Sequence, residues 1–412
     1  MARRLRVLFL THRLPFPPKS GDRLRAHYLI RDAATWADVD LLSLVADAAE
    51  AADAAQFSDC LDRCITLQRP PLGNLARGAA ALLTNTPLTH RLLDAPGARQ
   101  ALTSLVAERR PDVVLAYCSS MARFALEPPL AGLPLVVDLV DVDSGKWMAL
   151  AESSRPPLSW VYRREARCLG RFETRLSRVA SRLLVVNERE RQAMLALAPD
   201  AKVTVVPNGV NVGAFRTGDP PAESARVVFC GVMDYAPNVE AAVWLANDIW
   251  PLVRRERADA ELQLVGASPS AAVRALADPA RGVIVTGSVP DVRPYVWGAG
   301  VAVAPLLLAR GVQNKALEAV AGGVPCVVTP AVAAGLPAEV LAGCPVAESA
   351  GAFAGAILRV LALDPAARRR EAAAADIDAL DWPRRLTELR AIVEEAAGLP
   401  GPPSARAGGE RG

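Results

Sequence analysis

Short runs of apolar residues recur along this chain and alternate with longer segments of helical periodicity. In the first half of the chain these runs are residues 6–10, 39–44, 113–117, 135–139, 183–186 and 203–206. Runs that are apolar at nearly every position, rather than at every second one, are typical of parallel strands covered on both faces. Their alternation with helices predicts right-handed βαβ units in a doubly wound α/β sheet.

The pattern starts again after a joint rich in proline and glycine, between residues 207 and 225. The second series of apolar runs comprises residues 226–229, 261–265, 283–285, 301–304 and 326–328. A chain of 412 residues is too long for one ordinary core, since domains average about 150 residues. We therefore predict two Rossmann-like domains that face each other across a ligand cleft.

The predicted N-terminal domain comprises residues 1–208, and the predicted C-terminal domain comprises residues 209–378. A helical pattern at residues 379–398 predicts a C-terminal helix that packs back toward the N-terminal domain. Residues 399–412 are rich in glycine, proline and charge, and this composition predicts a disordered tail.

Charge and cysteine content exclude several classes of protein. A formal net charge of +3 gives no concentrated basic stripe, so no nucleic-acid partner is expected. The seven cysteines contain no CxxC pair, and the three histidines lack metal-ligand spacing, so we expect neither disulfides nor a metal or other cofactor. The apolar run Val7–Leu10 is too short for a signal peptide, and we expect a cytoplasmic location.

Four turns between a strand and a helix contain residues that could bind a ligand, since ligands of open α/β sheets lie beyond the carboxyl ends of strands. The first is PFPPKSGDRLRAH at residues 15–27. Its prolines stiffen the loop, and Gly21 permits close approach of the backbone to a ligand. The alternative is a rigid loop in which Ser20 or Asp22 caps the next helix.

The second turn is VVDLVDVDSGKW at residues 136–147, which places Asp138, Asp141 and Asp143 at the end of a strand. Carboxylates at this position can act as a general base, orient a hydroxyl group or bind a metal ion. Asp141 is the candidate for a functional role. The alternative is that Asp143 or Ser144 only caps the following helix.

The third turn is VFCGVMDYAPNVEAA at residues 228–242, where Gly231 stands at the position of a phosphate-facing glycine. We expect Asn238 to cap the helix that follows.

The fourth turn lies within VAPLLLARGVQNKALEAVAGGVP at residues 303–325. A helix that begins near Gln313 would bring its N-terminal amides, Arg310 and Lys315 to one point suited to a diphosphate. Glu318 lies one turn further along and could accept hydrogen bonds from ribose hydroxyls. The alternative is a surface Lys315–Glu318 pair that contributes a few tenths of a kcal/mol, roughly.

These motifs together resemble the retaining GT-B glycosyltransferases of glycosyltransferase family 4. LEAVAGGVPCVV and NGVNVGAF carry the general resemblance. FCGVMDYAPN, VTGSVPDVRPY, VAPLLLARGVQNKALEA, VDLVDVDSGKW and PPKSGDRLR are similar to the sugar transferases of exosortase (PEP-CTERM) and exopolysaccharide systems. The resemblance spans roughly residues 5–395, with the motifs in the order of the family.

The resemblance implies a nucleotide-diphosphate-sugar donor on the C-terminal domain, a glycan or lipid-linked acceptor on the N-terminal domain, and transfer with retention of anomeric configuration. It implies that Glu318 binds the ribose and that Lys315, with backbone amides around Gly311 and Val312, binds the diphosphate. It further assigns a phosphate-facing turn to Gly231, the donor side of the first loop to Gly21, and backbone contacts with the base to residues from Thr286 to Val289.

The chain departs from the family pattern at three places. Arg310 replaces the first of two glutamates that the family keeps eight positions apart. The segment GVMDYAPN lacks the usual Arg/Lys pair, so Arg310 and Lys315 are expected to neutralise the diphosphate. Val140-Asp141 replaces a His-Asp pair, which leaves Asp141 as the candidate catalytic group on the acceptor side.

Three other functions fit parts of the pattern: a metal-dependent GT-A transferase that uses Asp141 and Asp143, a nucleotide-sugar epimerase, and a catalytically silent binding module. The arginine-rich segment 158–182 also contains Trp160 and Tyr162. Such a helix either lies on an anionic membrane surface or packs with a solvated arginine face.

Overall fold

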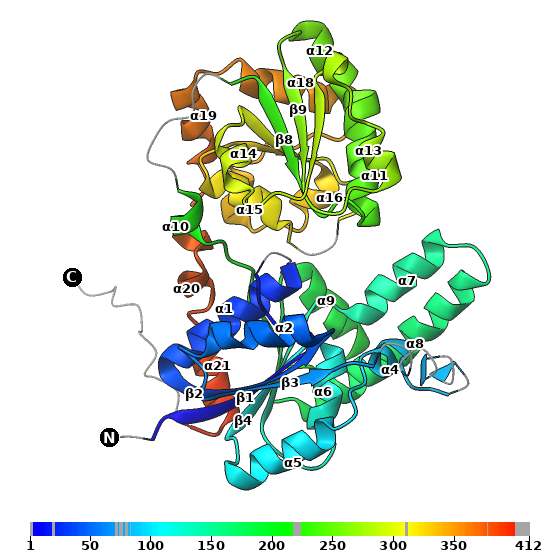
Figure 1. Cartoon of the computed structure of the whole chain (residues 1–412), viewed down its shortest axis with the longest axis vertical. Coiled ribbons are helices and arrows are strands. Elements are labelled where there is room, and N and C mark those ends of the chain that lie inside the picture. The colour runs from blue at the N-terminus through cyan, green and yellow to red at the C-terminus, as the bar shows by residue number, and fades with distance from the viewer. Residues whose placement is uncertain are drawn as a thin grey trace. The chain divides into compact units, whose positions relative to one another are not determined.

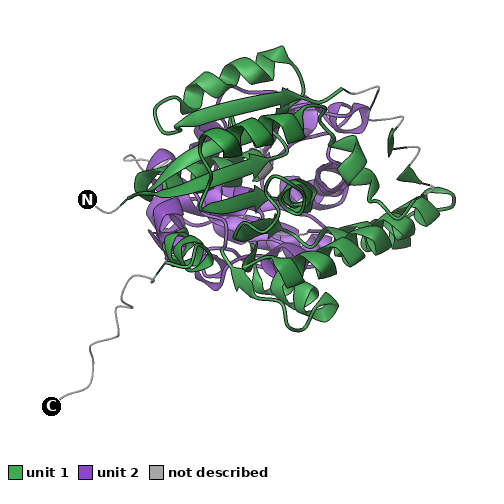
Figure 2. Cartoon of the chain, turned by 90° about the horizontal axis from the view of Figure 1, so that it is seen from below, with its two compact units in different colours: residues 1–206, 386–412 green, residues 207–385 purple. Residues whose placement is uncertain are grey.

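The computed structural model describes residues 3–18, 21–70, 73, 77–78, 81–82, 84–216, 224–309, 312–376 and 378–399, with Asp22 described by its backbone alone. The chain forms two compact units. Unit 1 comprises Met1–Val206 with Leu386–Gly412, and unit 2 comprises Pro207–Arg385 (Figure 2). Arg310, Gly311 and residues 400–412 of the predicted tail lie outside the described residues.

Unit 1 is built on a seven-stranded parallel sheet of order β3-β2-β1-β4-β5-β6-β7. The strands are β1 Leu5–Thr11, β2 Ala37–Val45, β3 Arg63–Gln68, β4 Val113–Tyr117, β5 Leu135–Val140, β6 Arg182–Val185 and β7 Val203–Val205. The edge strand β3 is missing from the sequence prediction because RCITLQ is only partly buried and alternates apolar with polar residues.

Helices cover both faces of this sheet (Figure 1). They are α1 Gly21–Trp36, α2 Ala48–Ala52, η1 Asp53–Phe57, α4 Leu88–Leu92, α5 Ala98–Glu108, α6 Ser119–Ala125, α7 Asp143–Ser153, α8 Leu158–Val179, α9 Glu188–Leu197 and α21 Leu389–Ala396. Leu8 and Leu10 of β1 join the core formed with α5, α6, α8 and α9. Because side chains alternate along a strand, Val7 and Phe9 lie on the opposite face, where α1 contacts β1.

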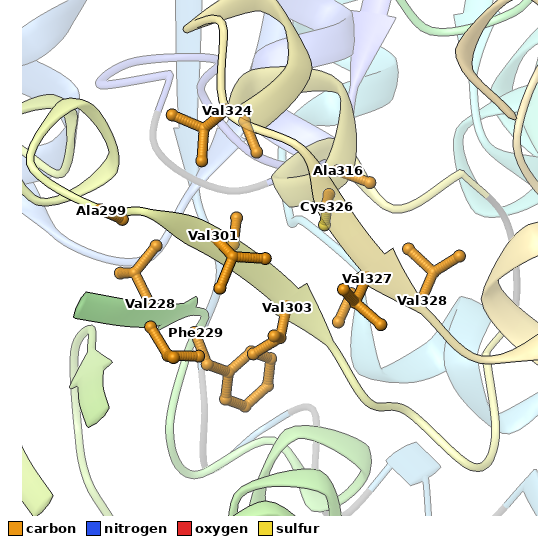
Figure 3. Packing of buried hydrophobic residues seen from close by; sticks show 14 of the residues in the cluster. Val228, Phe229, Ala299, Val301, Val303, Ala316, Val324, Cys326, Val327 and Val328 are labelled. Carbon is orange, nitrogen blue, oxygen red and sulfur yellow. The ribbon is translucent and has the colours of Figure 1, made fainter. Parts of the chain in front are cut away.

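Unit 2 contains a five-stranded parallel sheet of order β10-β9-β8-β11-β12. Its strands are β8 Arg226–Cys230, β9 Glu261–Val265, β10 Val283–Gly287, β11 Val301–Ala304 and β12 Cys326–Val328. Figure 3 shows the core at its centre, where the side chains of β8 and β11 pack together. The near-continuous burial of β8, β11 and β12 agrees with the predicted parallel sheet, whereas the outer strands β9 and β10 are only partly buried.

The helices of unit 2 are α10 Val212–Phe215, α11 Ala236–Trp244, η2 Leu245–Ile249, α12 Trp250–Glu256, α13 Ala271–Arg274, η3 Pro279–Arg281, α14 Arg293–Trp297, α15 Asn314–Ala321, α16 Pro330–Ala333, α17 Ala338–Leu341, α18 Ala350–Leu361, α19 Pro365–Ala372, η4 Asp378–Leu380 and α20 Trp382–Arg385. Among them, α15 and α18 pack on β11 and β12. The predicted two-domain α/β architecture with parallel sheets is therefore confirmed.

No single helix among the described residues is long and apolar enough to cross a membrane. One bent pair, α18 with α19, passes the same test of length and composition when its two helices are taken together.

Candidate functional site

Each sheet has one point where the direction of strand order reverses, and ligands of open α/β sheets bind at this point. In unit 2 the reversal lies between β8 and β11. The segments that leave these two strands contain Gly231 and the start of α15. The third and fourth turns of the sequence therefore belong to one site.

Lys315 is held at the N-terminal end of α15 by contacts with β8 and α11. Its Nζ donates a hydrogen bond to Oδ1 of Asn238, at 2.7 Å, and lies 4.7 Å from the ring centroid of Phe229. Gln313 provides no side-chain cap for the helix, so its side chain leaves the first backbone amides of α15 available to a ligand. Burial lowers the pKa of Lys315 to about 8.

Asn238 has a different role from the helix cap expected from the sequence. It is the third residue of α11, and Tyr235 precedes the helix without a side-chain cap. Its Nδ2 donates to the carbonyl of Val232, at 2.9 Å, while Oδ1 accepts from Lys315. The amide therefore fixes the lysine ammonium against the turn after β8.

Glu318 follows Lys315 on α15 but forms no ion pair with it or with any other described residue. The carboxyl group is partly buried, and burial raises its pKa to about 7 while Lys315 acts in the opposite direction. The alternative of a surface Lys315–Glu318 pair is therefore wrong. A carboxyl group in this position can accept hydrogen bonds from a polar ligand.

Two glycines bring the backbones together at the carboxyl ends of β8 and β9. A Cβ added to Gly266, whose φ is +150°, would lie 1.7 Å from the carbonyl oxygen of Gly231. A Cβ at Gly231 would lie 2.8 Å from Nδ2 of Asn238. A larger residue at Gly231 would displace Asn238, which holds Lys315, and one at Gly266 would displace the backbone of Gly231. Gly266 was not predicted as a site residue, although a glycine at the end of a strand indicates a close approach of the backbone to a neighbouring group.

Three further donor-side candidates, Thr286, Val289 and Val312, belong to unit 2. Thr286 is in β10, where its Oγ1 donates to the carbonyl of Gly287 at 2.9 Å. Val289 and Val312 are partly buried against the unit 2 core. Asn314, the first residue of α15, has a buried Oδ1 without a hydrogen bond. An unpaired acceptor at a helix start is available for a ligand hydroxyl or amine.

In unit 1 the strand order reverses between β1 and β4, which are followed by His12 and Cys118. The His12 ring stacks on Tyr117 with centroids 5.9 Å apart, and its Nδ1 lies 3.4 Å from Sγ of Cys118. Cys118 has a φ of +68°. Neither His12 nor Cys118 was among the predicted site residues, because a lone histidine after a strand carries no motif. Gly21 is the exposed first residue of α1 in the same unit.

Asp141 follows an irregular end of β5. The register shifts between Asp138 and Val140, and Val140 has a φ of +65°, an unfavourable conformation for a β-branched residue. Strain of this kind persists where the surroundings enforce it, and it concentrates at functional sites. One oxygen of Asp141, Oδ1, is buried without a hydrogen bond. Burial, reinforced by the charge of Glu190, raises the pKa of Asp141 to about 6.

The other two carboxylates of this turn are occupied. Asp138 forms a fully buried ion pair with Arg25, at 2.7 Å between Nε and Oδ2. Asp143 accepts a hydrogen bond from Oγ of Ser119, at 2.8 Å, and burial raises its pKa. Asp141 alone has a free buried oxygen, so of the three it is the one suited to accept a proton. Within the described ranges, no group of three or more His, Cys, Asp and Glu side chains could hold a metal ion.

Family profiles match both units of the chain. The "Glycosyl transferase 4-like domain" profile matches residues 2–209, and the "Glycosyl transferases group 1" profile matches residues 224–363. A comparison with curated protein sequences gave no match.

Solved structures share the fold at low sequence identity. Sucrose-phosphate synthase from Thermosynechococcus elongatus has a TM-score of 0.70 and 18% identity, over 95% of this chain and 99% of that chain. HepE from Anabaena, solved in complex with UDP-glucose, has a TM-score of 0.63 and 14% identity, over 96% and 100%. Trehalose 6-phosphate synthase from Burkholderia multivorans has a TM-score of 0.64 and 14% identity, over 96% and 99%.

Proposed function

The chain belongs to the glycosyltransferases that have a 4-like domain and a group 1 domain, and from this premise we propose that it transfers a sugar from a nucleotide diphosphate to an acceptor. Its two parallel sheets form a GT-B fold, which is incompatible with the GT-A alternative. We further propose that the transferred group is a hexose and that transfer retains anomeric configuration.

The observation that carries the proposal is the group of side chains at the reversal point of the unit 2 sheet. The ammonium of Lys315 and the start of α15 provide positive charge for a diphosphate, since helix N-termini and ammonium groups both attract phosphate. Glu318 lies on the same helix, within one turn, and is unpaired among described residues. This combination fits the two ends of a ribose diphosphate. The solved HepE complexes contain UDP and UDP-glucose, which makes UDP the first nucleotide to test.

Charge neutralisation of the leaving diphosphate lowers the barrier to glycosyl transfer when the charges are already in place. We assign this role to Arg310 and Lys315, with backbone amides at Gly311 and Val312. Gly231 would let the turn after β8 approach the phosphates, and Thr286 to Val289 would meet the base. Gly21 would border the donor from unit 1. No metal or other cofactor is part of the proposal.

The test of the donor site is Glu318→Gln, measured as UDP affinity by calorimetry together with release of nucleotide from a panel of UDP-, GDP-, ADP- and dTDP-sugars. The variant removes the charged acceptor of the ribose hydroxyls, and a charge-assisted hydrogen bond contributes about 1.5–3 kcal/mol, roughly a tenfold to hundredfold loss of affinity. Glu240→Gln, at an exposed position of α11, is the matched control. Unchanged UDP affinity in Glu318→Gln would overturn the ribose assignment.

The acceptor side of the proposal rests on Asp141. We propose that its carboxylate orients or deprotonates the acceptor hydroxyl, because its free oxygen is buried and its pKa is raised to about 6. The acceptor is a glycan or a lipid-linked precursor of exopolysaccharide or cell-surface polysaccharide, in a system of the exosortase type. We also propose a cytoplasmic location for the enzyme.

A peripheral contact with the membrane face belongs to the same proposal. Trp160 and Leu158, at the start of α8, are 65% and 54% exposed, and Arg163 is exposed beside them. An exposed tryptophan next to arginines suits an anionic bilayer surface. Arg164 is not part of that surface, because it donates to the backbone carbonyls of Ala81, Thr84 and Thr86.

The membrane contact is tested by co-sedimentation with vesicles of phosphatidylglycerol, compared with vesicles of phosphatidylcholine. Trp160→Ala and Arg163→Glu should each reduce the fraction bound to anionic vesicles severalfold, since each basic residue near such a surface contributes about 1 kcal/mol. Equal binding of both variants and the unaltered chain would remove the membrane contact from the proposal.

A further inference from the structure

A pocket of about 710 Å³ lies between α7, α8 and α9 of unit 1, and none of the residues assigned above lines it. Helices α7 and α8 pack along each other as a hairpin (Figure 1). The α8 wall includes Arg167, Arg171, Arg175 and Arg178, and Met148 of α7 and Leu197 of α9 also line the pocket. The pocket is large enough for a phosphate group and several carbon atoms beyond it.

The arginine wall is not neutralised by the protein. Arg167, Arg171, Arg175 and Arg178 follow one another at intervals of four, four and three residues, so they share one face of α8. The residues that line the pocket include no Asp or Glu, and none of the four arginines forms an ion pair with a described residue. Other exposed arginines of this chain do pair, as Arg191 does with Glu188.

Glu173 of α8, two positions from both Arg171 and Arg175, already accepts hydrogen bonds from another residue. Glu173 is buried and accepts hydrogen bonds from the backbone N–H and the hydroxyl of Ser144. Burial raises the pKa of Glu173 to about 7, so the group is partly neutral at physiological pH. Four like charges on one face repel one another, and an anionic ligand would relieve that repulsion.

A second hollow of about 350 Å³ lies on the other side of Arg167 and Arg171. It is lined by Arg164 and by polar groups such as Thr84 and Asn85, and Arg171 donates to Oδ1 of Asn85 at 3.4 Å. Arg167 and Arg171 therefore border two pockets. An anion with more than one phosphate could contact these guanidinium groups from both pockets at once.

The apolar wall distinguishes this pocket from a simple anion site. Met148 and Leu197 are each 38% exposed, and the pocket also includes Ala166 and Gly170. Exposed apolar groups in the same pocket as a row of cations match a ligand that has a charged group next to a hydrophobic one. Ser144, which also lines the pocket, follows Asp141 by three residues, so the pocket adjoins the proposed acceptor side.

We propose that the α7–α8 pocket binds the phosphate group of an amphiphilic acceptor, with the guanidinium groups on the phosphate and the adjoining hydrocarbon against Met148 and Leu197. The pocket itself follows from the geometry of unit 1. Only the identification of its ligand as the acceptor rests on the proposed transferase function.

The test is direct binding of dodecyl phosphate, kept below its micelle concentration, to the full chain by calorimetry. Arg171→Glu and Arg175→Glu should each weaken binding roughly tenfold or more, because each replaces a charge-assisted contact by repulsion. Arg155→Glu makes the same charge change at an exposed position ahead of α8 that does not line the pocket, and should leave binding within about twofold. An equal loss in Arg155→Glu would overturn the proposal in favour of unspecific charge attraction.

A second variant fills the pocket without changing charge. A Cβ at Gly170 would lie 3.6 Å from Cβ of Ser144, an ordinary contact, so Gly170→Ala should be tolerated. Gly170→Leu adds a larger side chain at a position that lines the pocket, and should weaken dodecyl phosphate binding while Gly170→Ala does not. Equal binding by both variants, each with unchanged circular dichroism, would overturn the location.

Two further ligands separate the contributions of the two walls. Inorganic pyrophosphate should bind roughly tenfold more weakly than dodecyl phosphate, and the neutral dodecyl maltoside should not bind. If pyrophosphate bound as tightly as dodecyl phosphate, the apolar residues would not contribute to binding. If dodecyl maltoside bound as tightly as dodecyl phosphate, the arginines would not contribute. UDP affinity should stay unchanged in all pocket variants. The donor assignment at Glu318 is therefore tested by UDP binding alone, and the pocket by dodecyl phosphate binding alone.

Discussion

At the scale of single residues, burial acts on two groups in opposite directions. It raises the pKa of Asp141 to about 6 and lowers the pKa of Lys315 to about 8. In both cases burial disfavours the charged form, which for a carboxyl group is the deprotonated form and for an amine the protonated one. Both groups therefore lose part of their charge near neutral pH, and a ligand that favours the charged form would restore it.

Asp141→Asn should lower the rate of transfer and raise the stability of the protein. General-base assistance contributes about a hundredfold to ten-thousandfold, so a loss of at least a hundredfold in kcat is expected. In the unaltered enzyme the rate should fall as the pH falls through about 6, the pKa of Asp141. A pH–rate profile and kcat of the variant measure both effects.

The stability effect of Asp141→Asn has the opposite sign. Because the folded-state pKa lies above the ordinary value, the folded protein binds the proton more tightly, and the charged carboxylate costs stability above pH 6. The variant should therefore raise the free energy of unfolding by about 1–3 kcal/mol at pH 8 and not at pH 4. Glu152→Gln, exposed on α7, is the control. A variant less stable at pH 8 would contradict the assigned cause.

Lys315 should take up a proton when a nucleoside diphosphate binds. With a pKa of about 8, the amine is half neutral at pH 8, and a nearby diphosphate favours the ammonium form. Calorimetry in buffers of different ionisation enthalpy should give uptake of about 0.5 proton at pH 8 and less at pH 6.5. Lys315→Arg, which keeps its charge, should abolish the uptake, and uptake that persists in this variant would assign the proton to another group.

At the scale of secondary-structure elements, the strand ends are where the chain departs from regular structure. β5 ends in a register shift and a positive φ at Val140, and β8 and β9 end in the paired glycines Gly231 and Gly266. The irregular end of β5 comes just before Asp141, and the turn after β8 leads to Asn238. The position of Asp141 thus depends on what holds β5, and the buried Arg25–Asp138 pair joins β5 to α1.

Removal of Arg25 should destabilise unit 1 strongly. Arg25→Met leaves the Asp138 carboxylate buried without its partner, which costs about 3–5 kcal/mol. Denaturant unfolding should show this loss, and the double change Arg25→Met with Asp138→Leu should recover part of it. The exposed pair of Arg99 and Glu127 gives the comparison, with less than about 1 kcal/mol expected. Equal costs at both pairs would show that burial does not govern the effect.

The sequence alone predicts some of these elements and contacts and not others. Continuous apolar runs predicted most strands and the parallel sheets, because burial on both faces leaves a local pattern. β3 was missed because an edge strand is half exposed. Asn238 was assigned as a cap because its contact with Lys315 joins residues 77 positions apart. Arg25 and Asp138, 113 positions apart, likewise leave no local signal. Tertiary pairing of this kind overrides local preference.

At the scale of the whole molecule, each unit has its own core. The unit 2 core is formed by residues from Val210 to Leu380, and the core on one face of the unit 1 sheet is formed by residues from Leu8 to Met194. Separate cores allow separate unfolding, so scanning calorimetry should resolve two transitions.

UDP should raise only the transition of unit 2. Binding at a hundred times the dissociation constant stabilises the bound unit by about 2.7 kcal/mol, which is about 5–10 °C for a unit of this size. Arg25→Met should lower only the other transition. A single transition that moves as a whole with UDP would show that the two units unfold together.

Unit 1 is completed by a segment far from the rest of its sequence. Helix α21 buries Leu389, Ile392 and Val393, contacts α1 and β5, and its Glu395 pairs with Arg182. During synthesis on the ribosome, residues of unit 1 up to Val206 emerge first, yet their last helix follows only after all of unit 2. Because domains fold as they emerge, unit 2 can reach its final structure while unit 1 still lacks α21.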